Sequence, residues 1–456
     1  MLIDKKTDFS QKELSFTEMD EGYTTKQAIA EAKRCLNCQK PLCRTGCPIE
    51  NEIPSFIAEL AKGNVGEASQ IIAKRSNLPA VCGRVCPHEK QCEGACILAK
   101  KGNGIKIGKL ERFIADFDAE MEINKDKPLP FNSGKVAVIG SGPAGLTVAG
   151  DLAKAGYHVT VFEAQSEPGG ILMYGIPEFR LGKEIVRREI KKIENLGVNF
   201  VTNILIGPDI TVDELFNQGY DAIFIGTGTA LSKTLDIPGK DLAGVVQATY
   251  FLSTVMLYRS GLLDKAEIPV DEDDHVVIIG AGNVAMDAAR TVIRLGAKAT
   301  IVYHRTESDI TALPSEYELA KEEGVQFIWL ADTMRFQGES NLTGLEYERM
   351  EITDDKQLRG TGCLSTINAD KVILAIGQRP AARIVSTTTG IEVNKNGYVV
   401  TRERPYGMTT RKGVFSGGDV VGAKPATVVE AMKEAKKVAS GIDQYVQAVK
   451  LIEDCK

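Results

Sequence analysis

Several features that mark other classes of protein are scarce or missing in this chain of 456 residues. It has one Trp and only four scattered His, so it holds no histidine-rich metal site. Its longest apolar runs, 136–150 and 244–258, are interrupted by Gly, Ser or Thr and are too short to span a bilayer. The N-terminal stretch has no apolar segment of the kind a secretory signal needs. A net charge of −6 argues against non-specific binding to nucleic acid. We therefore expect a cytoplasmic protein with no membrane span and no nucleic-acid partner.

The ten cysteines are unevenly distributed, because eight of them lie between Cys35 and Cys96. In a reducing compartment, clustered thiols are more often metal ligands or redox groups than disulfides. The first four follow the pattern C-x2-C-x4-C-x3-C-P, which is close to that of the ferredoxins, and the other four follow from position 82. Thiolates suit both iron–sulfur clusters and zinc, and spacing alone leaves both open.

The segment that holds these cysteines is predicted to be helical. Helices are expected at 25–35, 54–62 and 66–74, the second with Pro54 at its start and Gly63 just after its end. The polar stretch 124–134 contains two Pro and is predicted to be a linker.

A dinucleotide-binding fingerprint follows the linker. The apolar run Lys135–Ile139 predicts a strand, and Gly140-Ser-Gly-Pro-Ala-Gly145 predicts a tight turn into a helix that ends near Gly156. A second strand is expected at His158–Glu163. In such a unit the glycines admit a pyrophosphate to the helix N-terminus, and the acid that ends the second strand accepts hydrogen bonds from a ribose.

The same pattern recurs 140 residues later, with Gly280, Gly282 and Ala285 as the fingerprint. Strands are expected at 275–279 and 299–303. The acid at the end of the second strand is replaced by His304 and Arg305, and a cation there favours the 2′-phosphate of NADP over the free hydroxyl of NAD. Arg305 as a solvated surface cation is the alternative interpretation.

The C-terminal segment indicates a flavin. Residues 413–419 predict a strand that ends in Gly-Asp, and a helix is expected from Ala426 past Ala439. Asp419 is then placed to bind a ribityl hydroxyl, with the helix N-terminus facing the cofactor. Joined to the first fingerprint, this motif predicts FAD. The expected fold class is α/β, with two Rossmann-like dinucleotide-binding domains, for FAD and NAD(P), preceded by an α-helical iron–sulfur domain.

The order of longer motifs resembles a known family. These motifs are SGPAGL (141–146), EPGGILMYGIPEFRL (167–181), IFIGTGT (223–229), GAGNVAMDAAR (280–290), AIGQRP (375–380) and SGGD (416–419). They are similar to the pyridine-nucleotide:flavin oxidoreductases and, more narrowly, to the glutamate synthase (NADPH) small-subunit family. That family is related to the N-terminal part of dihydropyrimidine dehydrogenase and to the large subunit of the NADH-dependent ferredoxin:NADP oxidoreductase.

The motifs and the resemblance together assign two sets of cofactor residues and no catalytic side chain. The FAD set is Gly140, Gly142, Pro143, Ala144, Gly145, Glu163, Gly170, Arg180, Gly228, Gly418, Asp419 and Thr427. The NAD(P) set is Gly280, Gly282, Asn283, Val284, Ala285, His304, Arg305 and Gly377.

The resemblance also implies two [4Fe–4S] clusters with interleaved ligands. Cys82 would then be a bystander, and a sequential division of the eight cysteines is the competing assignment. The implied ligands are Cys35, Cys38, Cys43 and Cys96 for one cluster, and Cys47, Cys86, Cys92 and Glu111 for the other. Two departures from the family are the long spacing from Cys86 to Cys92, which is closer to the other two relatives, and Thr311, where some relatives have a phosphate-binding Arg.

The predicted function is electron transfer from NADPH, with NADH as the alternative, through FAD and two clusters to a partner protein. A flavin accepts a hydride and releases single electrons, so it can join a nicotinamide to a cluster. The partner would be the glutamate synthase large subunit, a ferredoxin or a flavoprotein, in a hetero-oligomer. The alternatives are a ferredoxin:NADP oxidoreductase, which can be electron-bifurcating, and a dihydropyrimidine dehydrogenase-type subunit. An alternative from a different class of function is a non-catalytic dinucleotide-binding module with structural zinc.

Three domains are expected on the same grounds. They are 1–130 for the clusters, 131–245 with 378–456 for FAD, and 246–377 for NAD(P)H. A disulfide reductase is disfavoured, because outside the N-terminal group only Cys363 and Cys455 remain, far apart in sequence.

Overall fold

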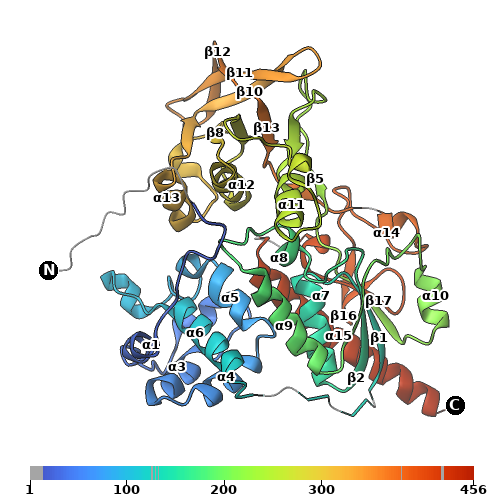
Figure 1. Ribbon diagram of the computed structural model, residues 1–456. Helices are drawn as coiled ribbons and strands as arrows, with labels where there is room; N and C mark the ends of the chain where they lie inside the picture. Colours follow the sequence, from blue (N-terminus) through green and yellow to red (C-terminus); the bar gives the residue numbers. More distant parts are fainter. Residues whose placement is uncertain are drawn as a thin grey trace. The chain divides into compact units, whose positions relative to one another are not determined.

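The computed structural model describes residues 14–124, 127–128, 130–131, 133–381, 383–422 and 426–455. Part of the predicted linker at 124–134 thus lies outside the described residues. Two compact units are formed (Figure 1). One contains the chain up to Met19, Tyr174–Phe179 and Ser232–Gln378, and the other contains Asp20–Met173, Arg180–Leu231 and Arg379–Lys456. We call them the nucleotide unit and the flavin unit, after the fingerprint that each contains.

The N-terminal part of the flavin unit is helical, as predicted. A Thr24–Gln27 capping box starts the first helix, and Pro54 and the left-handed Gly63 bound the third. Buried Phe56, Ile57 and other apolar residues form the core between the helices. Their bounds are α1 Thr25–Ala32, α2 Leu42–Gly46, α3 Ile53–Lys62, α4 Val65–Ala73, α5 Pro79–Val85 and α6 Ile107–Glu120.

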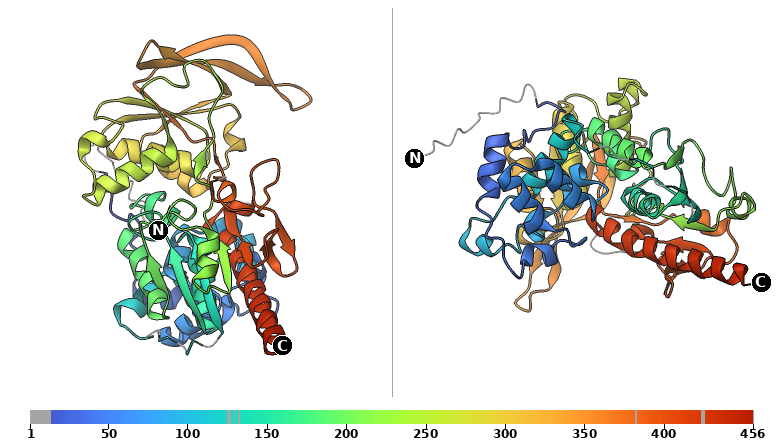
Figure 2. Two further views of the ribbon diagram at one scale, coloured as in Figure 1. Left: turned by 90° about the vertical axis from the view of Figure 1, so that its right-hand side faces the viewer. Right: turned by 90° about the horizontal axis from the view of Figure 1, so that it is seen from below.

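The rest of the flavin unit is built on a seven-stranded sheet in the order β15-β16-β17-β4-β1-β2-β3. Strands β17, β4, β1, β2 and β3 are parallel, so their carboxyl ends lie at one edge. The strands are β1 Gly134–Ile139, β2 Tyr157–Phe162, β3 Asn199–Val201, β4 Ala222–Ile225, β15 Thr401–Glu403, β16 Tyr406–Thr409 and β17 Val414–Ser416. The helices of this part are α7 Pro143–Lys154, α9 Lys183–Asn195, α10 Val212–Asn217, α14 Arg383–Ser386 and the long α15 Val428–Asp454 (Figure 2).

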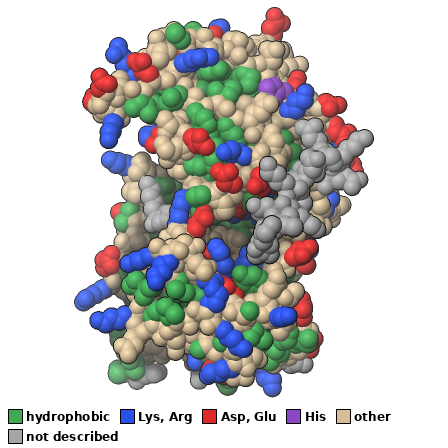
Figure 3. Space-filling model, turned by 90° about the vertical axis from the view of Figure 1, so that its left-hand side faces the viewer, with side chains coloured by type: hydrophobic (Ala, Val, Ile, Leu, Met, Phe, Trp, Pro, Cys, Tyr) green, Lys and Arg blue, Asp and Glu red, His purple; other side chains and the backbone are tan. Residues whose placement is uncertain are grey.

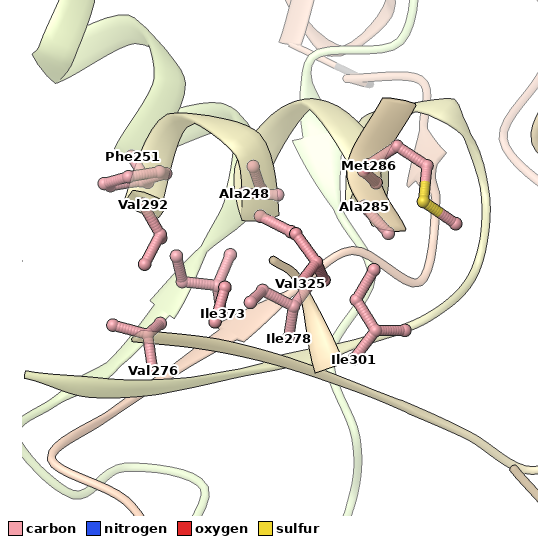
Figure 4. Close-up of a cluster of buried hydrophobic side chains, with 14 of the residues drawn as sticks. Ala248, Phe251, Val276, Ile278, Ala285, Met286, Val292, Ile301, Val325 and Ile373 are labelled. Atoms are coloured by element: carbon pink, nitrogen blue, oxygen red, sulfur yellow. The ribbon is translucent and has the colours of Figure 1, made fainter. Parts of the chain in front are cut away.

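The nucleotide unit contains a parallel five-stranded sheet in the order β6-β13-β7-β8-β9. Its helix α12 packs on this sheet through Ala285, Met286 and Val292 (Figure 4). An antiparallel sheet of β10, β11 and β12 extends beyond it (Figure 2). The strands are β6 Val245–Gln247, β7 His275–Ile279, β8 Lys298–Tyr303, β9 Gln326–Trp329, β10 Ala331–Gly338, β11 Leu342–Ile352, β12 Leu358–Asn368 and β13 Lys371–Leu374. The helices are α11 Ala248–Arg259, α12 Asn283–Arg294 and α13 Pro314–Glu322.

Three short elements lie at the boundaries of the units: α8 Ile171–Tyr174, β5 Leu231–Ser232 and β14 Gln378–Arg379. Among the described residues, no helix combines the length and the hydropathy that crossing a membrane requires.

Two buried arginines of α12 hold distant segments to the nucleotide unit. Arg290 forms ion pairs with Glu316 and Glu323, at 2.7 and 2.8 Å, and is almost completely buried. Arg294 pairs with Glu323 as well, and its guanidinium carbon lies 3.9 Å from the centre of the Phe179 ring. Both guanidinium groups also donate to the sulfur of Met19. The segments that end at Met19 and Phe179 are therefore bound to α12, although each continues into the flavin unit.

A second ion-pair group joins the helical part to the rest of the flavin unit. Asp116 on α6 accepts from Arg84 on α5 at 2.8 Å and from Arg188 on α9 at 2.5 Å. Burial opposes ionisation, yet the two guanidinium groups hold the pKa of Asp116 below its usual value. Asn77 adds a neutral link, because its amide donates to Asp151 on α7 at 2.8 Å.

The first prediction tests this link. Asp116→Asn leaves two partly buried arginines without their anion, so we expect the free energy of unfolding to fall by about 3 kcal/mol in urea titrations. Glu120→Gln, on the exposed end of the same helix, is the matched control and should change it by less than about 0.5 kcal/mol. Equal effects of the two substitutions would contradict this role for Asp116.

Candidate functional site

The first glycine turn joins β1 to α7 in the way that its sequence predicts. A Cβ at Gly145 would lie 1.9 Å from the carbonyl oxygen of Gly140, so only glycine allows the helix to pack this closely. A Cβ at Gly142 would meet nothing within 4 Å, and this residue caps α7 without a side-chain hydrogen bond. The first N–H groups of α7, which begins at the buried Pro143, are thus available to a phosphate group.

Glu163 directly follows β2 and lies against this turn. Its carboxylate is buried and accepts a backbone N–H from Ser141 at 3.0 Å and one from Gln165 at 2.9 Å. Gly170 approaches from the other side, since a Cβ there would lie 2.8 Å from the Cα of Gly142. The turn, the acid and Gly170 are therefore neighbours.

The C-terminal Gly-Asp motif returns to the same turn. A Cβ at Gly418 would lie 2.9 Å from the Cβ of Ala144, so the two motifs are in contact. One carboxylate oxygen of the adjacent Asp419 is buried and has no hydrogen-bond partner. Burial raises the pKa of Asp419 to about 6. A buried acceptor of this kind fits a hydroxyl of a bound ligand, which agrees with the ribityl chain of FAD.

The remaining members of the predicted FAD set are less closely tied to the turn. Thr427 caps α15, and its hydroxyl accepts the N–H of Glu430 at 3.4 Å. Gly228 has a positive φ of 64° shortly after β4. Arg180 is half-buried at the start of a segment of the flavin unit.

The second glycine turn joins β7 to α12 in the nucleotide unit. Gly282 caps α12 without a side-chain hydrogen bond, as Gly142 does for α7, and Ala285 is fully buried. The side-chain oxygen of Asn283 accepts the N–H of Leu313 at 2.9 Å. The loop that follows β8 is thereby held beside the turn.

The side chains around this second turn differ from those around the first. The hydroxyl of Thr311 lies 3.3 Å from the position of a Cβ at Gly282, so it faces the place expected for a phosphate. His304 and Arg305 follow β8 directly and are exposed, and Arg305 Nε donates to His304 Nε2 at 3.3 Å. Val284 is 38% exposed. Gly377 follows β13, and its carbonyl accepts the N–H of Lys233 at 3.0 Å.

Four cysteines line one pocket between the N-terminal helices. They are Cys35, Cys38, Cys43 and Cys96, so a residue of the second sequence group joins three of the first. Burial, with Cys35 nearby, raises the pKa of Cys43 to about 11. The other lining residues are apolar: Leu36, Pro41, Leu42, Ile53, Pro54, Ile57, Ile97, Leu98, Ile105 and Ile107. This is the set that the interleaved assignment requires, and Cys47 is absent from this lining.

The other predicted ligands gather around the buried Glu111. Burial and the neighbouring Glu189 raise the pKa of Glu111 to about 8. Burial, Glu111 and Cys82 raise that of Cys47 to about 12. The pKa of Cys92 is also raised, by burial and by Cys47 and Glu111. Asn51 links two of these groups, because its side-chain amide donates to Glu111 at 3.4 Å and its backbone N–H bonds to the Cys47 sulfur.

Cys86 belongs to this second group, and Cys82 lies beside it. A hydrogen bond with the Cys82 thiol, together with burial and Glu111, raises the pKa of Cys86. The Cys82 sulfur also lies 3.6 Å from the sulfur of Met432 on α15. The family resemblance gives Cys82 no ligand role. Its contact with Met432 could not be predicted from local sequence, because the two residues are 350 positions apart.

Among the described residues, no group of three or more His, Cys, Asp or Glu could hold a single metal ion. A [4Fe–4S] cluster takes each of its four ligands at a different iron, so its ligands stand farther apart than those of a single ion. The residues of the pocket fit such a cluster in chemistry, since they are thiols enclosed by apolar side chains, and the second group offers thiols and one carboxyl group.

Comparison with known proteins gives two family models and many relatives. Residues 12–123 match a model described as dihydropyrimidine dehydrogenase domain II, 4Fe-4S cluster, and residues 134–435 match pyridine nucleotide-disulphide oxidoreductase. The glutamate synthase [NADPH] small chain of Halomonas elongata is 35% identical, over 94% of this chain and 93% of its own. The NAD-dependent dihydropyrimidine dehydrogenase subunit PreT of Escherichia coli is 34% identical, over 94% of this chain and 97% of its own. Mycobacterium tuberculosis FprA in complex with NADPH shares the fold, with a TM-score of 0.58 and 19% identity over 71% of this chain and 87% of its own.

The second prediction concerns the unpartnered oxygen of Asp419. Its folded pKa of about 6 is above the ordinary value of 3.8, so the contribution of this group to stability is full below pH 4 and is lost as the pH rises to 6. In protein freed of FAD, Asp419→Asn should therefore gain stability over the wild type between about pH 4.5 and 7, as measured by thermal unfolding. In FAD titrations the same variant should bind at least about tenfold more weakly, because a charge-assisted hydrogen bond is lost.

Asp241→Asn, which changes an exposed acid, is the control and should change neither the stability nor the affinity for FAD. A pH-independent difference between Asp419→Asn and the wild type would show that the carboxylate is not buried as described.

Proposed function

Because the chain belongs to the family of the glutamate synthase small chains and is an iron–sulfur flavoprotein oxidoreductase, we propose that it passes electrons from NADPH through FAD and two [4Fe–4S] clusters to a partner protein. The observation that carries this proposal is the pocket in which cysteines from two distant segments meet. A nicotinamide gives up a hydride, a cluster accepts one electron, and a flavin can exchange either. No side-chain acid or base is needed for that chemistry.

The chain's own residues bind and position these groups. At the first turn, Gly142 admits the pyrophosphate, while Glu163 and Asp419 accept hydrogen bonds from hydroxyl groups of FAD. At the second turn, Gly282 admits the pyrophosphate of the nicotinamide nucleotide, and Arg305 pairs with its 2′-phosphate.

Two cluster sites correspond to the two groups of ligands. Cys35, Cys38, Cys43 and Cys96 hold the first cluster in the apolar pocket. Cys47, Cys86, Cys92 and Glu111 hold the second, with Cys82 beside them. The contact between Cys82 and Met432 supports an order in which the second cluster would be nearer to the flavin, since the first turn of α15 lies against Gly418, next to Asp419.

The domain limits 1–130, 131–245 with 378–456, and 246–377 are part of this proposal. They are supported by the two sheets, since β17 returns to the strands of the first fingerprint and β13 pairs with β7 of the second. The ten cysteines form no disulfide, which is consistent with a cytoplasmic location.

The partner is proposed to be a large subunit of the glutamate synthase type, as the name of the relative from Halomonas elongata implies. A dihydropyrimidine dehydrogenase-type partner is the second candidate. It is favoured by the long spacing from Cys86 to Cys92 and by the match to PreT over nearly the whole of that chain.

The third prediction tests the clusters and their ligands. Protein prepared without oxygen should contain about eight iron atoms, four for each cluster, and NADPH should produce a paramagnetic iron signal. Cys96→Ala should reduce the iron content to about half, whereas Cys82→Ala should retain all of it. A colourless protein that contains only zinc, or equal losses in the two variants, would reject the assignment.

The fourth prediction concerns the choice of nucleotide. Arg305→Glu should raise KM for NADPH about tenfold or more and change that for NADH little, because a charge-assisted contact with the 2′-phosphate is lost. Lys298→Glu reverses the charge of an exposed residue at the opposite end of β8 and should affect neither nucleotide. Equal changes for NADPH and NADH in Arg305→Glu would overturn the role of Arg305.

A further inference from the structure

The pocket lined by four cysteines has large apolar side chains on its outer side. Leu36, Leu42 and Ile97 all line it, yet they are 60%, 44% and 41% exposed. Single exposed leucines are common, but three around one pocket form a patch, and such patches mark interaction sites. A protein that covered this patch would contact side chains that also line the pocket.

The two segments that form this part of the pocket carry only positive charge. Residues 33–43 and 96–107 contain six Lys or Arg and no Asp or Glu, in a chain whose net charge is −6. Arg34 and Lys106 pair with Glu31 and Glu93. The other four, Lys33, Lys40, Lys100 and Lys101, are exposed, and each lies within three positions of a residue that lines the pocket.

We call these four lysines together with Leu36, Leu42 and Ile97 the pocket rim. Figure 3 shows one face of the molecule, and its lower part, where Figure 1 has the N-terminal helices, displays hydrophobic side chains among charged side chains of both signs, with many Lys and Arg. An apolar centre with a charged border is the usual anatomy of a protein–protein interface.

The second group of proposed ligands is less accessible in part. Cys92 and Glu111 are only 6% and 8% exposed, whereas Cys47 and Cys86 are half-buried, as the four cysteines of the pocket are. The exposed apolar side chains that line the pocket therefore distinguish the first group as the one that a partner can cover.

We propose that the pocket rim is the docking site for the electron-accepting partner, a redox protein that presents an acidic face around its own cofactor. This inference rests on the proposed function and names the chemistry of its partner. Opposite charges increase the rate of encounter, and the apolar centre excludes water at contact. For each NADPH oxidised to NADP⁺ and one H⁺, two electrons leave through the pocket rim, so two one-electron acceptors are reduced.

The test uses the complete holoprotein and a purified [2Fe–2S] ferredoxin of strongly negative net charge as the probe. The rim variant combines Lys33→Glu, Lys40→Glu, Lys100→Glu and Lys101→Glu. The control variant makes the same change of net charge at exposed lysines elsewhere, with Lys74→Glu, Lys356→Glu, Lys395→Glu and Lys412→Glu. NADPH oxidation by ferricyanide and the iron content show that each variant is folded and loaded.

We expect the rim variant to lose at least tenfold in kcat/KM for ferredoxin at low salt and to keep its ferricyanide activity. The control variant should retain most of both activities. Added salt should slow the wild type steeply and the rim variant little, because salt screens the attraction between exposed charges. In the absence of NADPH, and thus without electron flow, the wild type and the control variant should bind immobilised ferredoxin more tightly than the rim variant.

Three results would overturn the docking site. They are a wild type that does not bind ferredoxin at low salt, equal losses in the rim and control variants, and binding to vesicles of anionic phospholipid in place of ferredoxin. Ferredoxin binding that depends on the rim, in a protein whose clusters NADPH does not reduce, would support docking and reject the proposed relay.

Discussion

Loss of water around acidic groups that are buried among the N-terminal helices is the constraint on which the rest of the structure depends. The pKa values of Cys47, Cys92 and Glu111 are all raised, chiefly by burial, so without metal these groups favour their neutral, protonated forms. Under the proposed ligand assignment these groups would lose their protons when iron binds, and the charge of the iron would replace the solvation lost on folding. Packing of the helices and assembly of the clusters would then be coupled in free energy.

The two glycine turns share the same local structure, a glycine N-cap between a strand and a helix, although they are assigned to two different cofactors. Gly142 and Gly282 both begin a helix without a side-chain cap, so either turn can receive a pyrophosphate. The residues just after the next strand distinguish the two turns, since Glu163 is buried against its turn whereas Arg305 is exposed. Under the proposed roles, the buried carboxylate would disfavour a 2′-phosphate on the ribose and the exposed guanidinium would attract one, so the two sites would select different nucleotides.

The sequence predicts those features that depend on neighbouring residues. Both glycine turns, the strands around them and the helix between Pro54 and Gly63 are found where the pattern indicates. Features that depend on contacts between residues far apart in the sequence cannot be predicted from local patterns. The spacing of the cysteines leaves open which of them share a pocket, and only the fold brings Cys96 to Cys35. The approach of Gly418 to Ala144 likewise depends on the pairing of β17 with β4, and that of Cys82 to Met432 depends on the packing of α15.

The binding of Met19 and Phe179 to α12 has a consequence for how the protein can be divided. The chain crosses between its units after residues 19, 173, 179, 231 and 378, so neither unit is a continuous piece of sequence. A fragment limited to Ser232–Gln378 would expose the guanidinium groups of Arg290 and Arg294, which Met19 and Phe179 otherwise cover. A folded nucleotide-binding fragment has to include both of these short segments, and an exchange of this unit between relatives has to transfer them with it.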